Sequence, residues 1–220
     1  MSKFKLMALT AIAAGVILPS FADRTLNDGL VAYLPFDNSM TENAVAVSPV
    51  APEASTTTAP ALENNGMVGK CLNIPSGAFV KLTGSDSVTL ANSSLGFEDS
   101  NRSFTAMIWV KYGNQSGDPS IFGNKTWSGG AKGVIIAGQD KSTKVKCNVG
   151  NGSARKDVYF TGEGSSVWTF YAMVGTNGSF TVYHGKSDGT ISSQTMSIAN
   201  FTMASTYPLH RAGRYGKLQL

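Results

Sequence analysis

The sequence contains few of the residues on which most catalytic and metal sites depend. Its 220 residues include two histidines, His184 and His210, and two cysteines, Cys71 and Cys147. Zinc sites use His and Cys ligands in short, recurring spacings, and nucleophilic catalysis needs a base close to its nucleophile. These four scattered residues follow neither pattern. The composition therefore argues against a zinc enzyme and against a hydrolase with a paired nucleophile and base.

Long hydrophobic runs are also absent, except for Leu6 to Leu18 near the N-terminus. This run follows Lys3 and Lys5 and ends in Pro19-Ser20-Phe21-Ala22, with small residues at the last and third-last positions, which is the pattern of a signal peptide. It is shorter than the roughly 20 residues that cross a bilayer comfortably. We therefore predict a signal peptide over residues 1–22 and a secreted, periplasmic or cell-surface protein of bacterial type, with no stable membrane span after cleavage.

The body of the chain has no excess of charge of one sign. The formal net charge is +4, but five of the basic residues lie in the predicted signal peptide or in the last ten residues. A local basic cluster is compatible with an anionic glycan or a nucleic acid. We interpret it as a solvated strand face and expect no nucleic-acid partner, because no nucleic-acid motif accompanies it. The cluster consists of Lys141, Lys144, Lys146, Arg155 and Lys156.

Helical periodicity is almost absent, and short alternating segments separated by turn residues predict an all-β chain. The clearest unit is a β-hairpin over residues 168–185, in which Asn177-Gly178 supplies the positive φ angles of a tight turn. Trp109 and Trp168 lie inside alternating segments, so we expect both in the core. We expect His184, at the end of the hairpin, to lie at the surface.

Other predicted strands surround this hairpin. Residues 103–112 form the longest, and their two apolar faces indicate a central position. Pro75-Ser76-Gly77 is a turn that pairs residues 70–74 with 78–82, and residues 41–65 form a long surface loop rich in Ala, Pro, Ser and Thr. The number of strands suits a two-sheet antiparallel β-sandwich. Further strands are predicted over residues 29–36, 120–122, 133–137, 144–149, 157–160 and 194–198.

Four segments, in this order, resemble the laminin-G-like branch of the concanavalin A-like lectin and glucanase superfamily. They are GLVAYLPFDN, VGKCLNIPSGAFVKL, FTAMIWVK with IFGNKTWSGG, and WTFYAMVGTNGSFTVYHG, and they are spread along the chain from Gly29 to Gly185. The resemblance implies a jelly roll of two antiparallel sheets, one of them concave, in an extracellular setting. It implies no single activity.

The C-terminal end departs from that family. In relatives, the segment similar to Tyr207-Pro208-Leu209 runs into an Ile-Gly-x-Asp-Gly turn and a closing strand, whereas residues 210–220 here read HRAGRYGKLQL. Codons for these residues can be chosen so that reading one base later spells the family text, so we hypothesise a frameshift near Leu209. We expect a domain over residues 23–209, an aberrant tail over residues 210–220, and a sandwich that lacks its closing C-terminal strand.

Sugar binding is the first site to consider, because two polar stretches combine an aromatic ring with polar side chains. A glycan stacks on an aromatic face and pairs its hydroxyls with amide or charged groups. Trp127 lies in a Gly-rich loop with Asn124 and Lys125, and Tyr159 lies close to Arg155. We predict ligand binding at these five residues. The alternative for Trp127 is a ring that folds back over the sandwich edge.

The resemblance also implies a structural calcium ion, which family members often bind with an Asp just after the first strand. Asp37 occupies that place, and Asn38 follows it. Calcium takes six or more oxygen ligands. The alternative is therefore that Asp37 and Asn38 cap a turn through side-chain to backbone hydrogen bonds.

Catalytic carboxylates and a disulfide are both disfavoured. Glucanases of the same superfamily use a Glu-x-Asp-x-x-Glu strand, which this chain lacks, and Glu98-Asp99 and Glu163 lie in predicted loops. We therefore expect no enzyme. Alternation along the strands points Cys147 toward the core and Cys71 away from it, which argues against a Cys71–Cys147 bridge.

These features together predict an exported, non-catalytic recognition module that binds carbohydrate or serves in adhesion. The first alternative is a protein–protein interaction module, and the second is a glycoside hydrolase. The expected partner is a glycan or an extracellular protein, and calcium is the implied cofactor.

Overall fold

A computed structural model describes residues 30, 32–42, 44, 53–81, 103–112, 118–125, 129–139, 143–164, 167–202, 210–212 and 216–219. The chain divides into two units, residues 1–30 and 31–220, and every described residue except Leu30 belongs to the second. Within these ranges the regular elements are all β-strands. A search of the same ranges found no helix with the length and apolar character that a membrane crossing requires. The predicted signal peptide lies outside the described residues.

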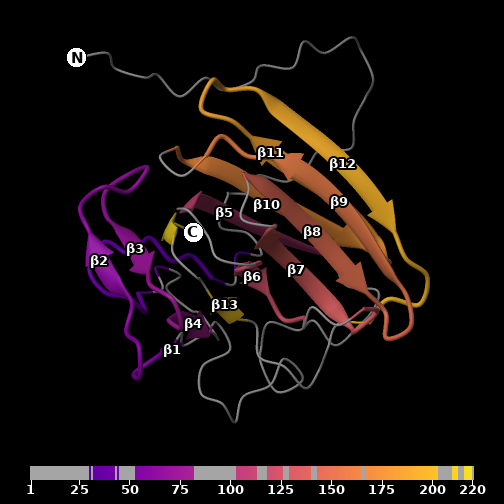
Figure 1. The fold of residues 1–220 in the computed structure, drawn as a ribbon, viewed down its shortest axis with the longest axis horizontal. Helices are drawn as coiled ribbons and strands as arrows, with labels where there is room; N and C mark the ends of the chain where they lie inside the picture. The colour runs from indigo at the N-terminus through magenta and orange to yellow at the C-terminus, as the bar shows by residue number, and fades with distance from the viewer. Residues whose placement is uncertain are drawn as a thin grey trace, which may run out of the picture. The chain divides into compact units, whose positions relative to one another are not determined.

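The strands form two antiparallel sheets, which confirms the predicted two-sheet β-sandwich (Figure 1). Sheet A contains, in spatial order, β1 (Glu53–Ala54), β4 (Phe79–Lys81), β13 (His210–Ala212), β6 (Ser120–Gly123), β7 (Gly133–Gly138), β8 (Lys144–Gly150) and β9 (Arg155–Thr161). Sheet B contains β12 (Ile191–Ser197), β11 (Ser179–Gly185), β10 (Thr169–Thr176), β5 (Phe104–Tyr112), β14 (Gly216–Gln219), β3 (Cys71–Ile74) and β2 (Ala61–Glu63).

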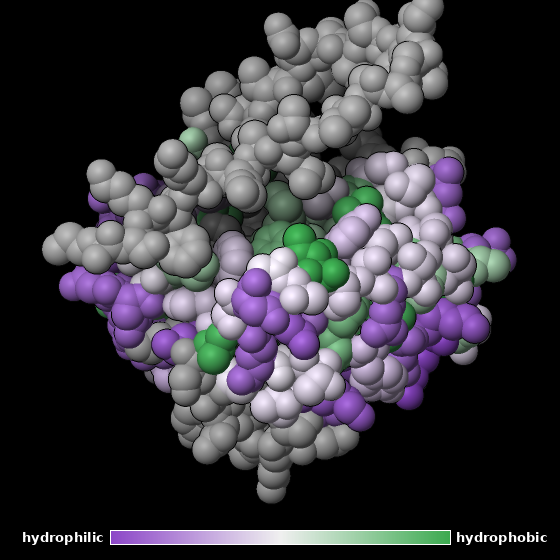
Figure 2. Space-filling model, turned by 90° about the horizontal axis from the view of Figure 1, so that it is seen from above, coloured by the Kyte–Doolittle hydropathy of each residue, from purple (hydrophilic) through white to green (hydrophobic). Residues whose placement is uncertain are grey.

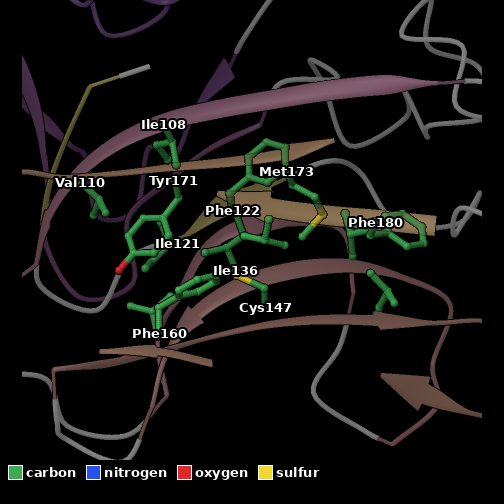
Figure 3. Packing of buried hydrophobic residues seen from close by; sticks show 14 of the residues in the cluster. Ile108, Val110, Ile121, Phe122, Ile136, Cys147, Phe160, Tyr171, Met173 and Phe180 are labelled. Atoms are coloured by element: carbon green, nitrogen blue, oxygen red, sulfur yellow. The ribbon is translucent and has the colours of Figure 1, made fainter. Parts of the chain in front are cut away.

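The core lies between the two sheets and is made by alternate side chains of the central strands. Ile108, Tyr171 and Met173 of sheet B point toward Ile136 and Phe160 of sheet A (Figure 3). As predicted, β5 is a central strand, since it pairs with β10 on one side and with β14 on the other. Burial of these apolar faces is the main contribution to the stability of the sandwich.

The predicted hairpin forms as β10 and β11. Asn177 and Gly178 have φ angles of 48° and 75° and close a two-residue turn, in which Thr176 pairs with Ser179. In that register Tyr171 lies opposite His184 on the core side, so His184 is only 2% exposed and our surface prediction for it is wrong.

The opposite face of the hairpin points away from the core. Trp109 of β5 contacts Phe170 of β10 at a ring-centroid distance of 5.2 Å, and both are only half-buried. Trp168 is half-buried as well. The prediction that Trp109 and Trp168 belong to the core is therefore wrong. Both faces of these strands carry large apolar residues, so alternation alone did not identify the inner one.

The predicted strand at 29–36 does not form among its described residues, 30 and 32–36. Pro35 has no N–H to donate to a sheet, and Phe36 adopts a φ angle of 60°, which a strand does not allow. Leu34 and Phe36 are nevertheless fully buried in the core. The alternating pattern therefore predicted correctly that these side chains are buried, but it predicted incorrectly that the segment pairs as a strand.

Three further expectations are corrected by the sheet topology. The turn at Pro75 forms, with the Ala78 N–H donating to the Pro75 carbonyl at 3.0 Å, but β3 and β4 on its two sides belong to different sheets. The predicted loop over residues 41–65 contains the short strands β1 and β2. Residues 210–220, expected to be an aberrant tail, contribute β13 between β4 and β6, and β14 between β3 and β5. The frameshift near Leu209 stays a hypothesis.

Candidate functional site

Polar side chains of β8 and β9 gather on the face of sheet A that points away from the core. Along β8, the core-facing Val145, Cys147 and Val149 alternate with Lys144, Lys146 and Asn148. Along β9, the core-facing Val158 and Phe160 alternate with Arg155, Asp157 and Tyr159. The antiparallel register sets Lys146 beside Tyr159, Asn148 beside Asp157 and Gly150 beside Arg155. We call these six polar residues, three from each strand, the β8–β9 cluster.

Asp157 organises the middle of the β8–β9 cluster. One carboxylate oxygen, Oδ2, lies 3.3 Å from Nε of Arg155 and accepts a hydrogen bond of 3.5 Å from the Tyr159 hydroxyl. The other, Oδ1, accepts a hydrogen bond from the Asn148 amide. Three neighbouring side chains are thus held in place by one carboxylate, which leaves the exposed ring of Tyr159 in a defined orientation.

Tyr159 is the aromatic residue of the β8–β9 cluster. Its side chain is 41% exposed, and the ammonium groups of Lys144 and Lys146 lie 5.4 and 6.0 Å from the ring centroid. Cations at this distance are attracted to the electron-rich ring face. The result is an exposed aromatic ring bordered by charged donors, which is the arrangement that binds a sugar ring and its hydroxyls.

Lys125 reaches the β8–β9 cluster from the loop after β6, because two glycines leave room for its side chain. A Cβ atom on Gly150 would lie 2.7 Å from Cε of Lys125, and one on Gly133 would lie 3.3 Å from its Cβ. The Lys125 ammonium donates to the Gly129 carbonyl at 3.0 Å. Its pKa is lowered mainly by burial and further by the charges of Arg155 and Lys146, while Asp157 opposes the shift.

The neighbouring Asn124 has a structural role. It is buried, its Oδ1 accepts a hydrogen bond of 3.1 Å from the Val134 N–H, and its own N–H donates to the Val134 carbonyl at 3.0 Å. This side-chain oxygen holds the loop after β6 against β7, and Asn124 as a ligand contact stays a prediction. Trp127 lies outside the described residues.

The structure therefore brings Lys125, Arg155 and Tyr159 together, and adds residues that we had not predicted as ligand contacts. Asn148 and Asp157 were missed, and Lys146 was noted only as part of a basic cluster. The sequence could have indicated these residues, because polar residues occupy every second position of two consecutive predicted strands. Whether these residues bind a ligand stays a prediction.

The calcium prediction concerns a turn that the chain's own groups already stabilise. Asp37 Oδ1 accepts a hydrogen bond of 3.1 Å from the Lys70 N–H. Asn38 donates to the Glu42 carboxylate from its backbone at 2.8 Å and from its amide at 2.7 Å, and these bonds, the side-chain one first, lower the Glu42 pKa.

The donors at this turn do not fit a calcium ion by themselves. Calcium takes six to eight oxygens, and within the described ranges no three His, Cys, Asp or Glu residues form a group suited to a metal. The turn-capping alternative accounts for the observed bonds, and calcium at Asp37 and Asn38 stays a prediction.

The two cysteines are buried free thiols on different sheets. Cys147 belongs to the core, where burial raises its thiol pKa. Cys71 donates a hydrogen bond of 3.1 Å to Oδ1 of Asn65. Neither thiol has the exposed, electropositive surroundings of a reactive cysteine.

The sequence Gly185 to Gly189 matches the Gly-x-Ser-x-Gly pattern of some hydrolases, a match that our sequence reasoning missed. That pattern places a nucleophile between a strand and a helix. Here it is the turn between β11 and β12, where the Ser187 hydroxyl and N–H donate to the Glu163 carboxylate at 2.7 and 2.6 Å. Glu163 thus holds a turn, and Glu98-Asp99 lies outside the described residues.

The sequence matches no protein-family model and no curated protein. Solved structures of similar fold include binding domains of botulinum neurotoxins. The binding domain of botulinum neurotoxin DC in complex with SialylT is 10% identical, with a TM-score of 0.61 over 89% of this chain and 47% of that chain. The same domain with rat synaptotagmin II is 11% identical (TM-score 0.61, 89% and 48%), and the serotype C1 binding domain is 11% identical (TM-score 0.60, 89% and 48%).

The chain thus spans about half the length of these binding domains. At such low identity the likeness shows the fold alone, an all-β sandwich. Membership of the laminin-G-like branch stays a prediction.

Proposed function

We propose that this chain is an exported, non-catalytic recognition module of the laminin-G-like kind that binds carbohydrate through the β8–β9 cluster. The observation that carries the proposal is the exposed ring of Tyr159 beside a carboxylate that already holds Arg155 and Asn148 in place. A preorganised aromatic and polar surface loses little conformational freedom when a sugar binds. Adhesion to a glycan-bearing surface would follow from the same contact.

The structural neighbours support a binding role of this general kind. One is described in complex with SialylT and another in complex with rat synaptotagmin II. Sandwiches of this fold therefore occur in complexes with partners of more than one kind. For this chain the polar character of the β8–β9 cluster favours the glycan.

Export through the predicted signal peptide and a structural calcium ion are further parts of the proposal. N-terminal sequencing of the protein recovered from a secreting host should begin at Asp23. If calcium binds, Asp37→Ala should lower the melting temperature more in calcium-containing buffer than in chelator, where only the bond to Lys70 is lost. A fall of equal size in both buffers would instead indicate that Asp37 acts only through its bond to Lys70.

A pair of tyrosine variants tests the sugar site. Tyr159→Ala should weaken binding of the strongest glycan found on an array by about tenfold or more, because a central aromatic contact carries much of the binding energy. Tyr183→Ala is the matched control, since Tyr183 is 38% exposed on the outer face of sheet B. Calorimetric titration should show full affinity for the control. Equal losses of glycan affinity in both variants, or a loss only in Tyr183→Ala, would contradict a glycan site on sheet A. Trp127→Ala tests the other predicted aromatic contact in the same way.

A protein-interaction role is the second candidate, favoured by exposed apolar residues on the outer face of sheet B. Met107 and Tyr183 both border Ala172 there, and Ile191 follows beside Gly185. On the face drawn in Figure 2, the most hydrophobic residues stand apart, with near-neutral and hydrophilic surface between them. Protein interfaces commonly have an apolar centre without charged residues, whereas the polar β8–β9 cluster suits a sugar, so the protein-interaction role ranks below glycan binding. If Met107→Ala lost binding to a protein partner but kept its glycan binding, protein interaction would become the first candidate function.

A further inference from the structure

The sequence contains three Asn-Gly pairs, and all three lie in described parts of the chain: Asn65-Gly66, Asn151-Gly152 and Asn177-Gly178. An asparagine before glycine is open to an internal reaction, because glycine has no Cβ that would hinder its own nitrogen. The glycine nitrogen forms a bond to the side-chain carbon Cγ of the asparagine. The bond from Cγ to the amide nitrogen breaks, ammonia leaves with the glycine proton, and a cyclic imide remains.

Water opens this imide at one of its two carbonyl carbons. Attack at Cγ breaks the new bond and gives aspartate. Attack at the main-chain carbonyl carbon gives isoaspartate, in which the main chain passes through the side-chain carbon and is longer by one methylene group. Both products carry a carboxylate in place of the amide. The reaction consumes only water, but the side-chain amide and the glycine N–H must be free to approach each other.

The Asn151-Gly152 pair is held at both reacting groups. Asn151 Oδ1 accepts a hydrogen bond of 3.0 Å from the Ser153 N–H, and its Nδ2 donates to the Ala199 carbonyl at 2.8 Å. The Gly152 N–H donates to the Gly130 carbonyl at 2.7 Å. The side chain and the attacking nitrogen must therefore both be released before they react.

The Asn65-Gly66 pair is held in a similar way in the turn between β2 and β3. Asn65 Oδ1 accepts a hydrogen bond of 3.1 Å from the Cys71 thiol. The Gly66 N–H donates to the Gly69 carbonyl at 3.2 Å. This pair too must break native hydrogen bonds before its groups approach each other.

The Asn177-Gly178 pair has no such restraint. Asn177 is exposed, and neither its side chain nor the Gly178 N–H forms a hydrogen bond within the described part of the chain. The Gly178 carbonyl accepts a hydrogen bond of 2.9 Å from the Ile198 N–H, but that carbonyl takes no part in the attack. Asn177 and Asn151 are both followed by Gly-Ser, so the two sites share their local sequence and the fold distinguishes them.

We propose that Asn177 is a site of spontaneous deamidation, and that the isoaspartate formed there loosens the β10–β11 hairpin. The turn has little spare room, since even a Cβ on Gly178 would collide with the Ile198 carbonyl oxygen and lie 3.5 Å from Cβ of Phe201. A main chain lengthened by a methylene group displaces Gly178 from these contacts. Phe201 packs against Phe180 at a ring-centroid distance of 4.7 Å, so the disturbance reaches the core. The modification does not depend on the proposed glycan binding.

Peptide mapping of the full chain tests the site. Trypsin cuts after Lys and Arg, so Asn177 falls in residues 157–186 and Asn151 in residues 147–155, and mass spectrometry measures the two conversions separately. Each hydrogen bond that must break first slows the reaction, so in the folded protein at pH 9 Asn177 should be converted at least about tenfold faster than Asn151. In urea the two sites should react at similar rates, because only their local sequence remains. Equal rates in the folded protein, or no conversion at Asn177, would overturn the inference.

Melting temperatures test the effect on the hairpin. The isoaspartate form, separated by chromatography, should melt below the unmodified protein. Asn177→Asp is the matched control: it adds the carboxylate without lengthening the main chain, and aspartate tolerates a positive φ angle, so it should melt close to the unmodified protein. Asn177→Gly keeps the turn but has no amide, so its peptide should keep its mass. An isoaspartate form that melts like the unmodified protein, or like an equally destabilised Asn177→Asp, would overturn the explanation by chain length.

Discussion

His184 illustrates how strongly one side chain depends on its surroundings. It stacks on Tyr171 at a centroid distance of 5.1 Å and packs against Phe160 at 5.2 Å. Its Nε2 is buried without a hydrogen-bond partner. Burial is the main cause that lowers its pKa below the ordinary value, and the charge of Lys186 adds to the effect, while Glu163 opposes it. The folded state therefore favours the neutral imidazole.

The lowered pKa of His184 predicts a loss of stability in mild acid. Full stability is present above the unfolded-state pKa, about 6.5, and is lost as the pH falls below it toward the lower folded-state value. The melting temperature, followed by circular dichroism from pH 8 to pH 5, should fall over this window. His184→Phe keeps an aromatic ring between Tyr171 and Phe160 but cannot be protonated, so its melting temperature should fall less. Parallel pH profiles for the two proteins would contradict this account.

At the scale of an element, the pairing of β7 with β8 makes room for Lys125. Gly133 lies opposite Gly150 in the register, and neither presents a side chain to the outer face. Lys125 and the turn at Gly130 and Ala131 occupy the space that a side chain at Gly150 would need. Two glycines in neighbouring strands are thus a packing requirement of the proposed site rather than a weakness of the sheet.

Gly150→Ala should displace that turn together with Lys125. A Cβ at this position would lie 2.7 Å from Cε of Lys125 and 2.8 Å from the Gly130 carbonyl oxygen, so the backbone must shift. We expect a loss of about 1–3 kcal/mol in the free energy of unfolding, measured in urea, and weaker glycan binding. Gly129→Asn is the control, because nothing lies within 4 Å of its Cβ position and asparagine tolerates a φ angle of 47°. A larger loss in the control would contradict the packing explanation.

At the scale of the whole sandwich, the two sheets are joined by the core and by a contact at one edge. Gln194 of β12, the edge strand of sheet B, donates to the Tyr159 carbonyl of β9, the edge strand of sheet A. The proposed binding surface therefore lies on a strand that the opposite sheet helps to hold. Weakening of the core should affect the site through this shared edge.

A pair of methionine variants tests which face is buried between the sheets. Met173 of β10 is fully buried, whereas Met107 of the adjacent β5 is exposed on the outer face. Met173→Ala should lower the free energy of unfolding by about 2–5 kcal/mol, because it leaves a cavity in the core. Met107→Ala should change it by about 0.5 kcal/mol or less. Urea unfolding of both variants measures these changes. Similar losses of unfolding free energy would contradict the assignment of Met173 to the inner face of sheet B and of Met107 to the outer face.

The local features of the fold could be predicted from the sequence. Asn177-Gly178 determined the hairpin turn, because few other residue pairs adopt two positive φ angles, and alternating apolar residues located most strands of both sheets. Arg155 and Tyr159 were recognised as an aromatic and a charged residue close together. Each of these inferences rests on neighbours in the chain.

Only the tertiary structure decided which strands pair and which face is inside. The β3 and β4 strands flank one turn yet join different sheets, and residues near the C-terminus enter the middle of both. Alternation marks two faces but does not choose between Trp168 and Tyr171 when both are apolar, because the choice depends on the register with a partner strand. Asn148 and Asp157 became part of a site only when β8 and β9 aligned. Pairing is a contact between distant segments, and the chemistry of each segment alone does not specify it.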